Sequence, residues 1–521
     1  MPGSLLKTLR RFVSVGFLLL ISLSFLDFTG ALKPIYFQRV TFLQFVPSML
    51  KFMHFPVLVG VGFIIVIMLT IAFGRVYCSW LCPLGAFQDI FTFFSRKTSR
   101  KKRFFSFTKP LNYLRYPVLG IVSILLLSGI TSGLVFADPF SVYGRMANHL
   151  FMPVALLLNN GISWLLAKAD IFTLKPYPYQ GFDLAATIIA LVFGVVIGWL
   201  ALKKGRLYCN AYCPVGSLLG LFSRLSVFRI YLDRTRCTHC GICAADCKSG
   251  CIDFRERVVD TSRCVGCFNC LTSCKDGGVK FDAGWKSNLL TDHKPTNGRR
   301  TALKALLIAP ALLTMNALAQ TKKIISNKAL ISNDRAHFSS PPGSVSIDRF
   351  NSVCTACHLC LSACPTRVLQ PSLFEYGLKG MLQPYMDYKS NFCNFECTRC
   401  GDVCPTGAIL PLFTDQKKRT QIGKARFVEK NCVVYTDGTA CGACSEHCPT
   451  KAVNMAPYNK PGLLIPKVEE AICVGCGACE YACPTMPYKA IYVEGNAVHK
   501  KADKPKGSAN SKEVVPEEFP F

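Results

Sequence analysis

The sequence lacks the motifs that a self-sufficient redox enzyme would carry. It has no Gly-rich nucleotide-binding loop, no flavin motif, no molybdenum–pterin domain and no pairing of a nucleophile with a base. These absences exclude a stand-alone enzyme with its own catalytic cofactor. Only 8 residues are His, and no two of them fall within the long apolar runs. The sequence therefore offers no pair of His ligands for a haem that would bridge a membrane.

Acidic residues are also scarce, with 31 Asp and Glu against 60 Lys and Arg and a formal net charge of +29. A charge this high suggests nucleic acid or anionic lipid as a partner. The basic clusters, however, follow the ends of apolar runs, where the positive-inside rule places them. No nucleic-acid partner is therefore expected.

Cysteine is abundant instead, with 29 residues in a chain of 521. A disulfide scaffold is excluded because such scaffolds are small and lack the repeated C-x2-C-x2-C-x3-C spacing seen here. In that spacing three thiolates bind one [4Fe–4S] cluster and the fourth binds the neighbouring cluster. Two such runs stand in tandem: Cys237, Cys240, Cys243 and Cys247, then Cys264, Cys267, Cys270 and Cys274. Lys248 and Lys275 replace the Pro that usually follows the fourth Cys.

Four further quartets follow in the C-terminal half, some with a wider first gap. They are Cys354, Cys357, Cys360 and Cys364; Cys393, Cys397, Cys400 and Cys404; Cys432, Cys441, Cys444 and Cys448; and Cys473, Cys476, Cys479 and Cys483. The spacing predicts six [4Fe–4S] clusters held by 24 Cys. Each cluster with four thiolates carries about −2, which lowers the net charge to about +17. Cys354-x2-Cys357-His358 also matches a haem c attachment motif, but Cys360 and Cys364 continue the ferredoxin spacing.

Four apolar runs, at about residues 12–28, 56–73, 116–136 and 183–202, are predicted to cross a membrane. Basic residues precede the first run, fill the loop between the second and third, and follow the fourth. The N-terminus, that loop and the segment after the fourth run are therefore expected in the cytoplasm. Residues 233–283 then lie on the cytoplasmic side.

Two cytoplasmic exits carry the same signature, G-R-x-Y-C-x3-C-P-x-G, at residues 74–85 and 205–216. This internal repeat implies two related helical pairs. Its Cys residues could meet at the membrane surface, where they would bind a metal, form a redox dithiol or simply pack as small apolar groups. These residues are Cys78, Cys82, Cys209 and Cys213. Cys251 is the one Cys left unassigned.

A possible export signal lies inside the chain. Arg299 and Arg300, an Ala/Leu-rich run and Ala317-Leu318-Ala319 predict a twin-arginine export signal, although Ala302 stands where an aromatic is usual. The alternative is an amphipathic linker or a fifth membrane anchor, and Pro310 interrupts the run. A domain that fills with clusters in the cytoplasm would have to be exported folded, which favours the export signal.

Residues 7–282, with four spans, two C-x3-C-P motifs and a two-cluster module, resemble the NapH/MauN family. Residues 299–493, with a twin-arginine leader and four clusters, resemble the NapG/MauM family of exported ferredoxin-type proteins. The chain thus looks like a fusion of the two. The fold class implied is an α-helical membrane bundle of four spans followed by two ferredoxin-like α+β modules. The expected domains are a membrane domain (1–232), a two-cluster module (233–283), a linker (284–340), a four-cluster domain (341–498) and a disordered tail (499–521).

The resemblance implies one-electron transfer from membrane quinol to a periplasmic redox protein or reductase, of the kind that serves nitrate reduction, in the bacterial inner membrane. The C-terminal domain would then be periplasmic. A candidate quinol region contains Tyr143, Arg145 and His149, because quinol oxidation needs a proton acceptor at membrane depth. The alternative function is a maturation or regulatory factor that gives electrons or metal to an oxidoreductase. About 30 Å of hydrocarbon would separate the two groups of clusters, so either quinol feeds the outer group separately or all six clusters lie in the cytoplasm.

Overall fold

A computed structural model describes residues 3–54, 60–98, 105–177, 183–283, 331–458 and 462–504. The twin-arginine segment and the part of the predicted tail beyond residue 504 lie outside this description. The chain divides into two compact units. The first consists of Met1–Lys323, Ser352–Ala363 and Pro405–Gly407; the second consists of Ile324–Asn351, Cys364–Cys404 and Ala408–Phe521.

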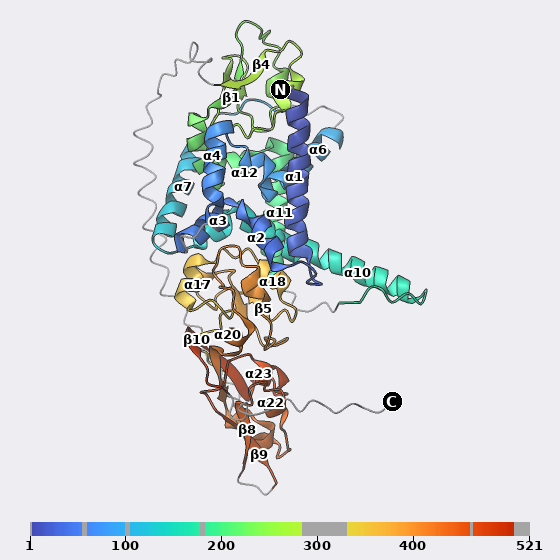
Figure 1. The fold of residues 1–521 in the computed structure, drawn as a ribbon, viewed down its shortest axis with the longest axis vertical. Coiled ribbons are helices and arrows are strands. Elements are labelled where there is room, and N and C mark those ends of the chain that lie inside the picture. Colours follow the sequence, from blue (N-terminus) through green and yellow to red (C-terminus); the bar gives the residue numbers. More distant parts are fainter. Residues whose placement is uncertain are drawn as a thin grey trace, which may run out of the picture. The chain divides into compact units, whose positions relative to one another are not determined.

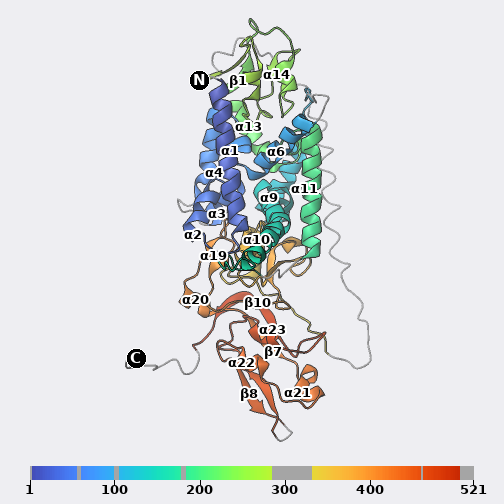
Figure 2. The same cartoon turned by 90° about the vertical axis from the view of Figure 1, so that its right-hand side faces the viewer.

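The first unit is a helical bundle with a small ferredoxin module at one end (Figures 1 and 2). Its bundle helices are α1 (Gly3–Leu26), α2 (Pro34–Phe42), α3 (Phe45–His54), α4 (Gly62–Phe73), α5 (Tyr77–Trp80), α6 (Pro83–Thr98), α7 (Asn112–Leu127), α8 (Ser132–Ala137), α9 (Pro139–Met146), a π-helical turn (Ala147–Phe151), α10 (Met152–Ala167), α11 (Leu184–Lys204), α12 (Leu207–Ala211) and α13 (Pro214–Phe222).

Apolar helices indicate that the first unit associates with a membrane. By length and composition, Gly3–Leu26, Pro139–Ala167 and Leu184–Lys204 could each cross a bilayer, whereas α4 and α7 are apolar but shorter. The predicted third run is broken, because α7 ends at Leu127 and α8 begins only at Ser132. The stretch Pro139–Ala167 was not predicted as a span, and its last part, α10, runs crosswise to α1 (Figures 1 and 2). The number of spans stays a prediction.

The two copies of the repeated signature form the same local structure. Gly74 and Gly205 directly follow the last residues of α4 and α11. Their φ values of +79° and +63° lie in the region that favours Gly. A short helix, α5 or α12, follows each of them. Pro83 and Pro214 then begin α6 and α13 at the first helical position, where a missing N–H costs no hydrogen bond.

The ferredoxin module of the first unit is closed by β1 (Phe228–Leu232) and β4 (Val279–Ala283), which pair antiparallel. The predicted domain boundary at residues 232 and 233 falls at the end of β1. Between these strands lie α14 (Ile242–Ala245), β2 (Ile252–Asp253), β3 (Val258–Val259) and α15 (Asn269–Ser273). A buried core of Cys and aliphatic side chains, with Phe268, fills the module.

The C-terminal half consists of short helices and two-stranded antiparallel sheets. Its helices are α17 (Ile347–Val353), α18 (Leu359–Ala363), α19 (Arg399–Asp402), α20 (Thr414–Lys418), α21 (Val433–Thr436), α22 (Ala443–Glu446) and α23 (Ala478–Ala482). Its strands are β5 (Leu369–Pro371), β6 (Pro384–Met386), β7 (Thr420–Phe427), β8 (Val453–Pro457), β9 (Leu464–Val468) and β10 (Ile491–Lys501). The longest pair is β7 with β10, so ordered strand continues past residue 498.

Candidate iron–sulfur and thiol sites

Two hollows lined by Cys lie in the ferredoxin module of the first unit. One is lined by Cys237, Cys240, Cys243 and Cys274. The other is lined by Cys247, Cys264, Cys267 and Cys270, together with Cys251. Each set combines three Cys of one run with the fourth Cys of the other run. This crossed arrangement is the one that the spacing predicts for a two-cluster ferredoxin.

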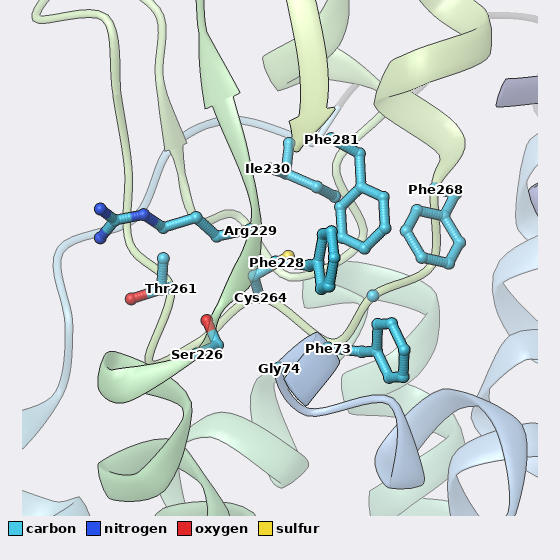
Figure 3. Close-up of a pocket in the computed structure, with 11 residues that line it drawn as sticks. Phe73, Gly74, Ser226, Phe228, Arg229, Ile230, Thr261, Cys264, Phe268 and Phe281 are labelled. Atoms are coloured by element: carbon cyan, nitrogen blue, oxygen red, sulfur yellow. The ribbon is translucent and has the colours of Figure 1, made fainter. Parts of the chain in front are cut away.

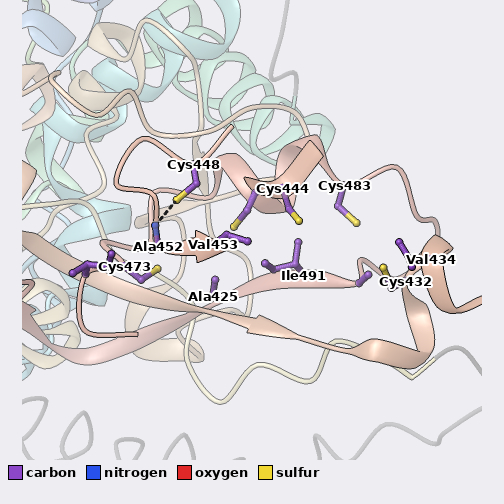
Figure 4. Packing of buried hydrophobic residues seen from close by; sticks show 13 residues of the cluster. Ala425, Cys432, Val434, Cys444, Cys448, Ala452, Val453, Cys473, Cys483 and Ile491 are labelled. Atoms are coloured by element: carbon purple, nitrogen blue, oxygen red, sulfur yellow. Dashed lines mark hydrogen bonds between the residues drawn. The ribbon is translucent and has the colours of Figure 1, made fainter. Parts of the chain in front are cut away.

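The second unit repeats the crossed arrangement. Figure 4 shows part of its core, with the sulfurs of Cys432, Cys444 and Cys483 near one another. The Cys sets of this unit are Cys364 with Cys393, Cys397 and Cys400; Cys483 with Cys432, Cys441 and Cys444; and Cys448 within electrostatic range of Cys473, Cys476 and Cys479. Of the remaining ligand candidates, Cys354, Cys357 and Cys360 belong to the first unit and Cys404 to the second.

The Cys-lined hollows fit clusters better than single metal ions. Each of the four hollows is lined by at least four Cys side chains, as many thiolates as a [4Fe–4S] cube binds. Within the described ranges, no three Cys, His, Asp or Glu side chains converge closely enough to bind one ion. Backbone N–H groups also point at the thiols, as from Gly278 to Cys274 Sγ at 3.2 Å. Such donors stabilise thiolate ligands and tune a bound cluster.

The crossed arrangement makes a testable prediction. Cys274→Ala should abolish the same cluster signal as Cys240→Ala, because both residues line one hollow, and it should spare the signal abolished by Cys267→Ala. The measurement is the electron paramagnetic resonance spectrum of the reduced full-length protein. A spectrum of Cys274→Ala that matched Cys267→Ala instead would mean that each run holds its own cluster.

Cys251, unassigned from the sequence, lies against the second hollow. It is buried, and its Sγ is 3.5 Å from Cys247 Sγ. A hydrogen bond from the Cys251 thiol lowers the pKa of Cys247 to about 7. Cys251 thus hydrogen-bonds to a candidate ligand of this site. The spacing rule could not indicate this role, because it considers only the Cys of the quartets.

Aromatic side chains cover the outer side of the same site. Figure 3 shows a pocket that is lined by Cys264 and, on one side of it, by the rings of Phe73, Phe228, Phe268 and Phe281. The Phe73 and Phe228 rings stack with centroids 5.6 Å apart. The end of α4 and the strands β1 and β4 therefore give Cys264 apolar surroundings on one side.

The repeated signature brings four buried thiols together, and we call Cys78, Cys82, Cys209 and Cys213 the Cys tetrad. Their mutual proximity is such that a charge on Cys78 or Cys209 would act on both Cys82 and Cys213. The thiols of Cys82 and Cys213 each accept an N–H from the first turn of the helix that follows, from Gly85 and Gly216. Burial raises the pKa of both thiols well above its usual value, and these N–H donors act in the opposite direction.

Two fully buried arginines cross between the repeats. Arg75 donates to Cys209 O at 3.0 Å and lies 3.7 Å from Cys78 Sγ. Arg206 donates to Cys78 O at 2.8 Å and lies 4.0 Å from Cys209 Sγ. Each guanidinium thus contacts the first thiol of its own copy and the backbone of the other copy. This exchange of contacts explains why each copy of the signature contains an Arg.

The last Gly of the signature makes room for the crossing arginines. A Cβ on Gly85 would lie 2.1 Å from Cys78 O and 2.6 Å from Arg206 Nη1. A Cβ on Gly216 would lie 2.2 Å from Cys209 O and 2.7 Å from Arg75 Nη2. Both distances to backbone oxygen are far below contact distance, so only Gly fits at either position.

A network of buried charges connects the helix that follows the first copy to Arg206 of the second copy. Asp89 on α6 pairs with Arg10 at 2.6 Å, with Arg206 at 2.9 Å and with Lys248 at 3.2 Å. Lys248, which replaces the usual Pro, therefore anchors the ferredoxin module to the bundle. Burial alone would raise the pKa of Asp89, but Arg206, Lys248 and Arg10 together hold it below its usual range.

Residues beside the Cys tetrad also bind the loops that line the second hollow of the module. Arg75 donates to Ser262 O at 2.9 Å, and Ser79 Oγ donates to Val265 O at 2.6 Å. On the other side, Arg206 N donates to Lys248 O at 2.9 Å. Both loops that carry ligands of that hollow are thus fixed directly by α5 and by the start of α12.

At the other end of the bundle, the predicted quinol region meets the loop of the first C-terminal quartet. Asp138 caps α9 and accepts from Ser141, whose Oγ lies 2.9 Å from Thr355 Oγ1. Arg145 Nη1 donates to Ala356 O at 3.2 Å. Thr131 Oγ1 donates to Cys354 O at 3.0 Å. All of these contacts lie within the first unit.

His149 also contacts the loop of the first C-terminal quartet. Its Nε2 is 2.8 Å from His358 Nδ1, and both rings are largely buried. Tyr143 lies farther back, where its hydroxyl hydrogen-bonds to Ser22 Oγ at 2.6 Å. His149 sits in the π-helical turn, which is a form often found at functional sites. Sequence reasoning selected His149 but missed His358, which it had considered only as part of a haem motif.

Two family models match the chain. One, described as a 4Fe-4S binding domain, matches residues 53–101 and 184–232, which contain the two copies of the signature. The other, described as a 4Fe-4S dicluster domain, matches residues 353–408 and 439–486. No solved structure matches the chain significantly.

Several curated proteins are similar over part of the chain. The methylamine utilization ferredoxin-type protein MauM of Methylobacillus flagellatus is 34% identical over 140 residues, which cover 26% of this chain and 59% of MauM. The ferredoxin-type protein NapG of Escherichia coli is 29% identical over 157 residues, 30% of this chain and 65% of NapG. The ferredoxin-type protein MauN of Methylorubrum extorquens is 25% identical over 194 residues, 36% of this chain and 53% of MauN. The chain thus spans a little more than half the length of these relatives.

The Cys-lined sites and these similarities together define the class of the protein. It is an iron–sulfur electron-transfer protein of the ferredoxin type, with apolar helices that associate it with a membrane. Its similarity extends to proteins of the NapG, MauM and MauN types.

Proposed function

We propose that the protein carries electrons from membrane quinol to a periplasmic redox protein or reductase in the bacterial inner membrane. The observation that carries this proposal is the 2.8 Å contact between His149 and His358. It joins a buried polar group in the bundle to the Cys354–Cys360 loop. A [4Fe–4S] cluster at such a loop supplies one-electron chemistry, whereas quinol gives up two electrons and two protons.

The His pair supplies what quinol oxidation needs from the protein. A hydrogen bond between two neutral imidazoles uses one donor and one acceptor, so the pair can take up one further proton. Arg145 and Asp138 beside it are buried ionisable groups at membrane depth, which mark functional sites by default. His149 thus acts as the proton acceptor and Arg145 orients the loop through Ala356 O.

The bundle supports placing the two ends on opposite membrane faces. Helix α1 has 24 residues, about 36 Å of helix, enough to cross ~30 Å of hydrocarbon. Lys7 near its start donates to Thr272 of the ferredoxin module, whereas Phe25 near its end packs beside Gly144. With the module in the cytoplasm, the Cys354–Cys360 loop faces the periplasm. The likeness to NapG and MauM favours the same side for the C-terminal domain, and to NapG favours service to a nitrate reductase.

The test is quinol-driven reduction of the clusters in full-length protein. His149→Gln should slow reduction by decyl-ubiquinol or menadiol by about 10²-fold, because it removes a general base, while dithionite still reduces the variant fully. His54→Gln is the matched control and should behave as wild type, since His54 is exposed at the end of α3. The measurement is the bleaching of the visible cluster absorption.

Each contrary outcome is specific. Unchanged rates in His149→Gln would remove this residue from the reaction. Wild-type clusters that neither quinol reduces, although dithionite does, would overturn the quinol donor and leave the maturation role as the better account.

A further inference from the structure

One Cys-lined hollow of the ferredoxin module opens to the protein surface, and we call it the outer hollow. It is lined by Cys237, Cys240, Cys243 and Cys274. All 29 Cys lie in the described ranges, and among them only Cys240 is exposed. The loop of Cys264, by contrast, is bound to the helical bundle by Arg75 and Ser79. A soluble electron carrier can therefore come close to a bound cluster at the outer hollow.

Two segments of the module form one surface beside Cys240. His239 Nδ1 lies 3.2 Å from Phe254 O, so the loop before Cys240 packs against the turn that follows β2. Arg257 Nη2 donates to Cys237 O at 3.4 Å from the end of the same turn. These contacts fix the position of the turn relative to the exposed ligand.

Exposed basic residues lie beside the outer hollow on three segments of the chain. Each of them lines the hollow or lies within two residues of one that does. They are Arg234, Arg236, Arg255 and Lys275, and we call these four residues the basic rim. The exposed acidic residues in the same segments are Glu256 and Asp276. Basic side chains are thus in excess around this site.

An apolar side chain lies next to the exposed ligand. Ile242 stands between Cys240 and Cys243 in the chain and is 45% exposed. Protein interfaces combine an apolar centre with a polar rim, and the interfaces of electron-transfer complexes are small. Ile242 and Cys240, with the basic rim beside them, fit a small interface of this kind.

The basic rim favours a partner with an acidic surface. Opposite charges steer two proteins together, raise the association rate and orient the encounter. The exposed cluster ligand beside the rim favours a redox protein over nucleic acid or lipid, since neither of these would exchange electrons with a cluster.

We propose that the basic rim docks a small acidic one-electron carrier, a soluble protein with an iron–sulfur or flavin centre, and that electrons enter the ferredoxin module there. The reduced carrier loses one electron and the cluster of the outer hollow gains it. That electron then passes to the cluster of the second hollow, and no atom or proton is transferred. The inference does not depend on quinol as a donor.

Stopped-flow reduction of the full-length protein tests the docking surface. The probe is a small acidic [2Fe–2S] ferredoxin of low potential, reduced beforehand and freed of excess reductant. Arg255→Glu combined with Lys275→Glu should slow electron transfer about 10-fold at ~10 mM salt, because the variant loses electrostatic steering. At ~1 M salt the Debye length falls to ~3 Å, and the rates of variant and wild type should converge.

The matched control is Lys379→Glu combined with Lys389→Glu, which makes the same change of charge at exposed residues of the C-terminal half. It should keep the wild-type rate. Dithionite should reduce both variants fully, which shows that their clusters are intact. Equal rates in the rim variant and the wild type, equal slowing in the control, or a wild type that the ferredoxin does not reduce would each overturn the docking surface.

Cross-linking of the wild-type protein gives a readout that needs no variant. A carbodiimide joins Lys amines to carboxylates that they contact, so the peptide of Lys275 should be linked to the ferredoxin in mass spectrometry. Cross-links confined to other lysines would contradict docking at the basic rim.

Discussion

Asp89→Asn is expected to destabilise the protein by about 3–5 kcal/mol, the cost of leaving buried charges without their partner. Asp89 holds Arg10, Arg206 and Lys248, and the most exposed of these three side chains is only 10% accessible. The variant would lose the tie between α1, α6, α12 and the ferredoxin module in one step. The measurement is the thermal denaturation midpoint in detergent, followed by cluster bleaching.

Asp89→Asn should also change how the stability of the protein depends on pH. The folded-state pKa of Asp89 lies below the unfolded value of about 3.9. Its stabilisation is therefore complete above that value and is lost as the pH falls toward the folded pKa. Asp89→Asn should flatten this acid limb. Asp170→Asn, at an exposed turn, should change stability by less than about 0.5 kcal/mol; an equal loss there would refute the network.

Gly216→Ala is expected to disrupt the Cys tetrad although it adds one methyl group. The new Cβ would lie 2.2 Å from Cys209 O, which is backbone and cannot rotate away. Overpacking of this kind costs about 1–3 kcal/mol, occasionally more, and here it displaces Cys209 itself. The variant should therefore lose stability, measured as a lower thermal denaturation midpoint in detergent.

Gly120→Ala provides the matched control, because nothing lies within 4 Å of its added Cβ and it sits inside α7. Ala in a helix interior should leave stability equal or raise it by about 0.5–1 kcal/mol. Equal stability in Gly216→Ala and Gly120→Ala would contradict the close packing of the repeats.

The grouping of the Cys residues around two hollows was predictable, because their spacing in the chain is that of a two-cluster site. Cys237, Cys240 and Cys243 lie on one tight turn, and the rule that the fourth Cys serves the neighbouring cluster located Cys274. The repeated signature likewise predicted that the Cys of its two copies could meet. In each case a short local pattern specifies the contact.

The contacts that cross the chain were not predictable. Arg75 reaches Cys209, and His149 reaches His358, over separations of 134 and 209 residues. Such pairs leave no periodicity, because either side chain alone resembles an ordinary polar residue. The helical stretch Pro139–Ala167 was missed as well, since its polar first turns broke the apolar run that marks a span.

The crossed arginines make the two copies of the signature depend on each other. Arg75 completes the backbone at Cys209 and Arg206 completes that at Cys78, so neither copy contains all the groups that hold its own thiols. A duplicated segment usually frees one copy to diverge. Here a change in the Arg of either copy would also disturb the backbone beside the first thiol of the other copy.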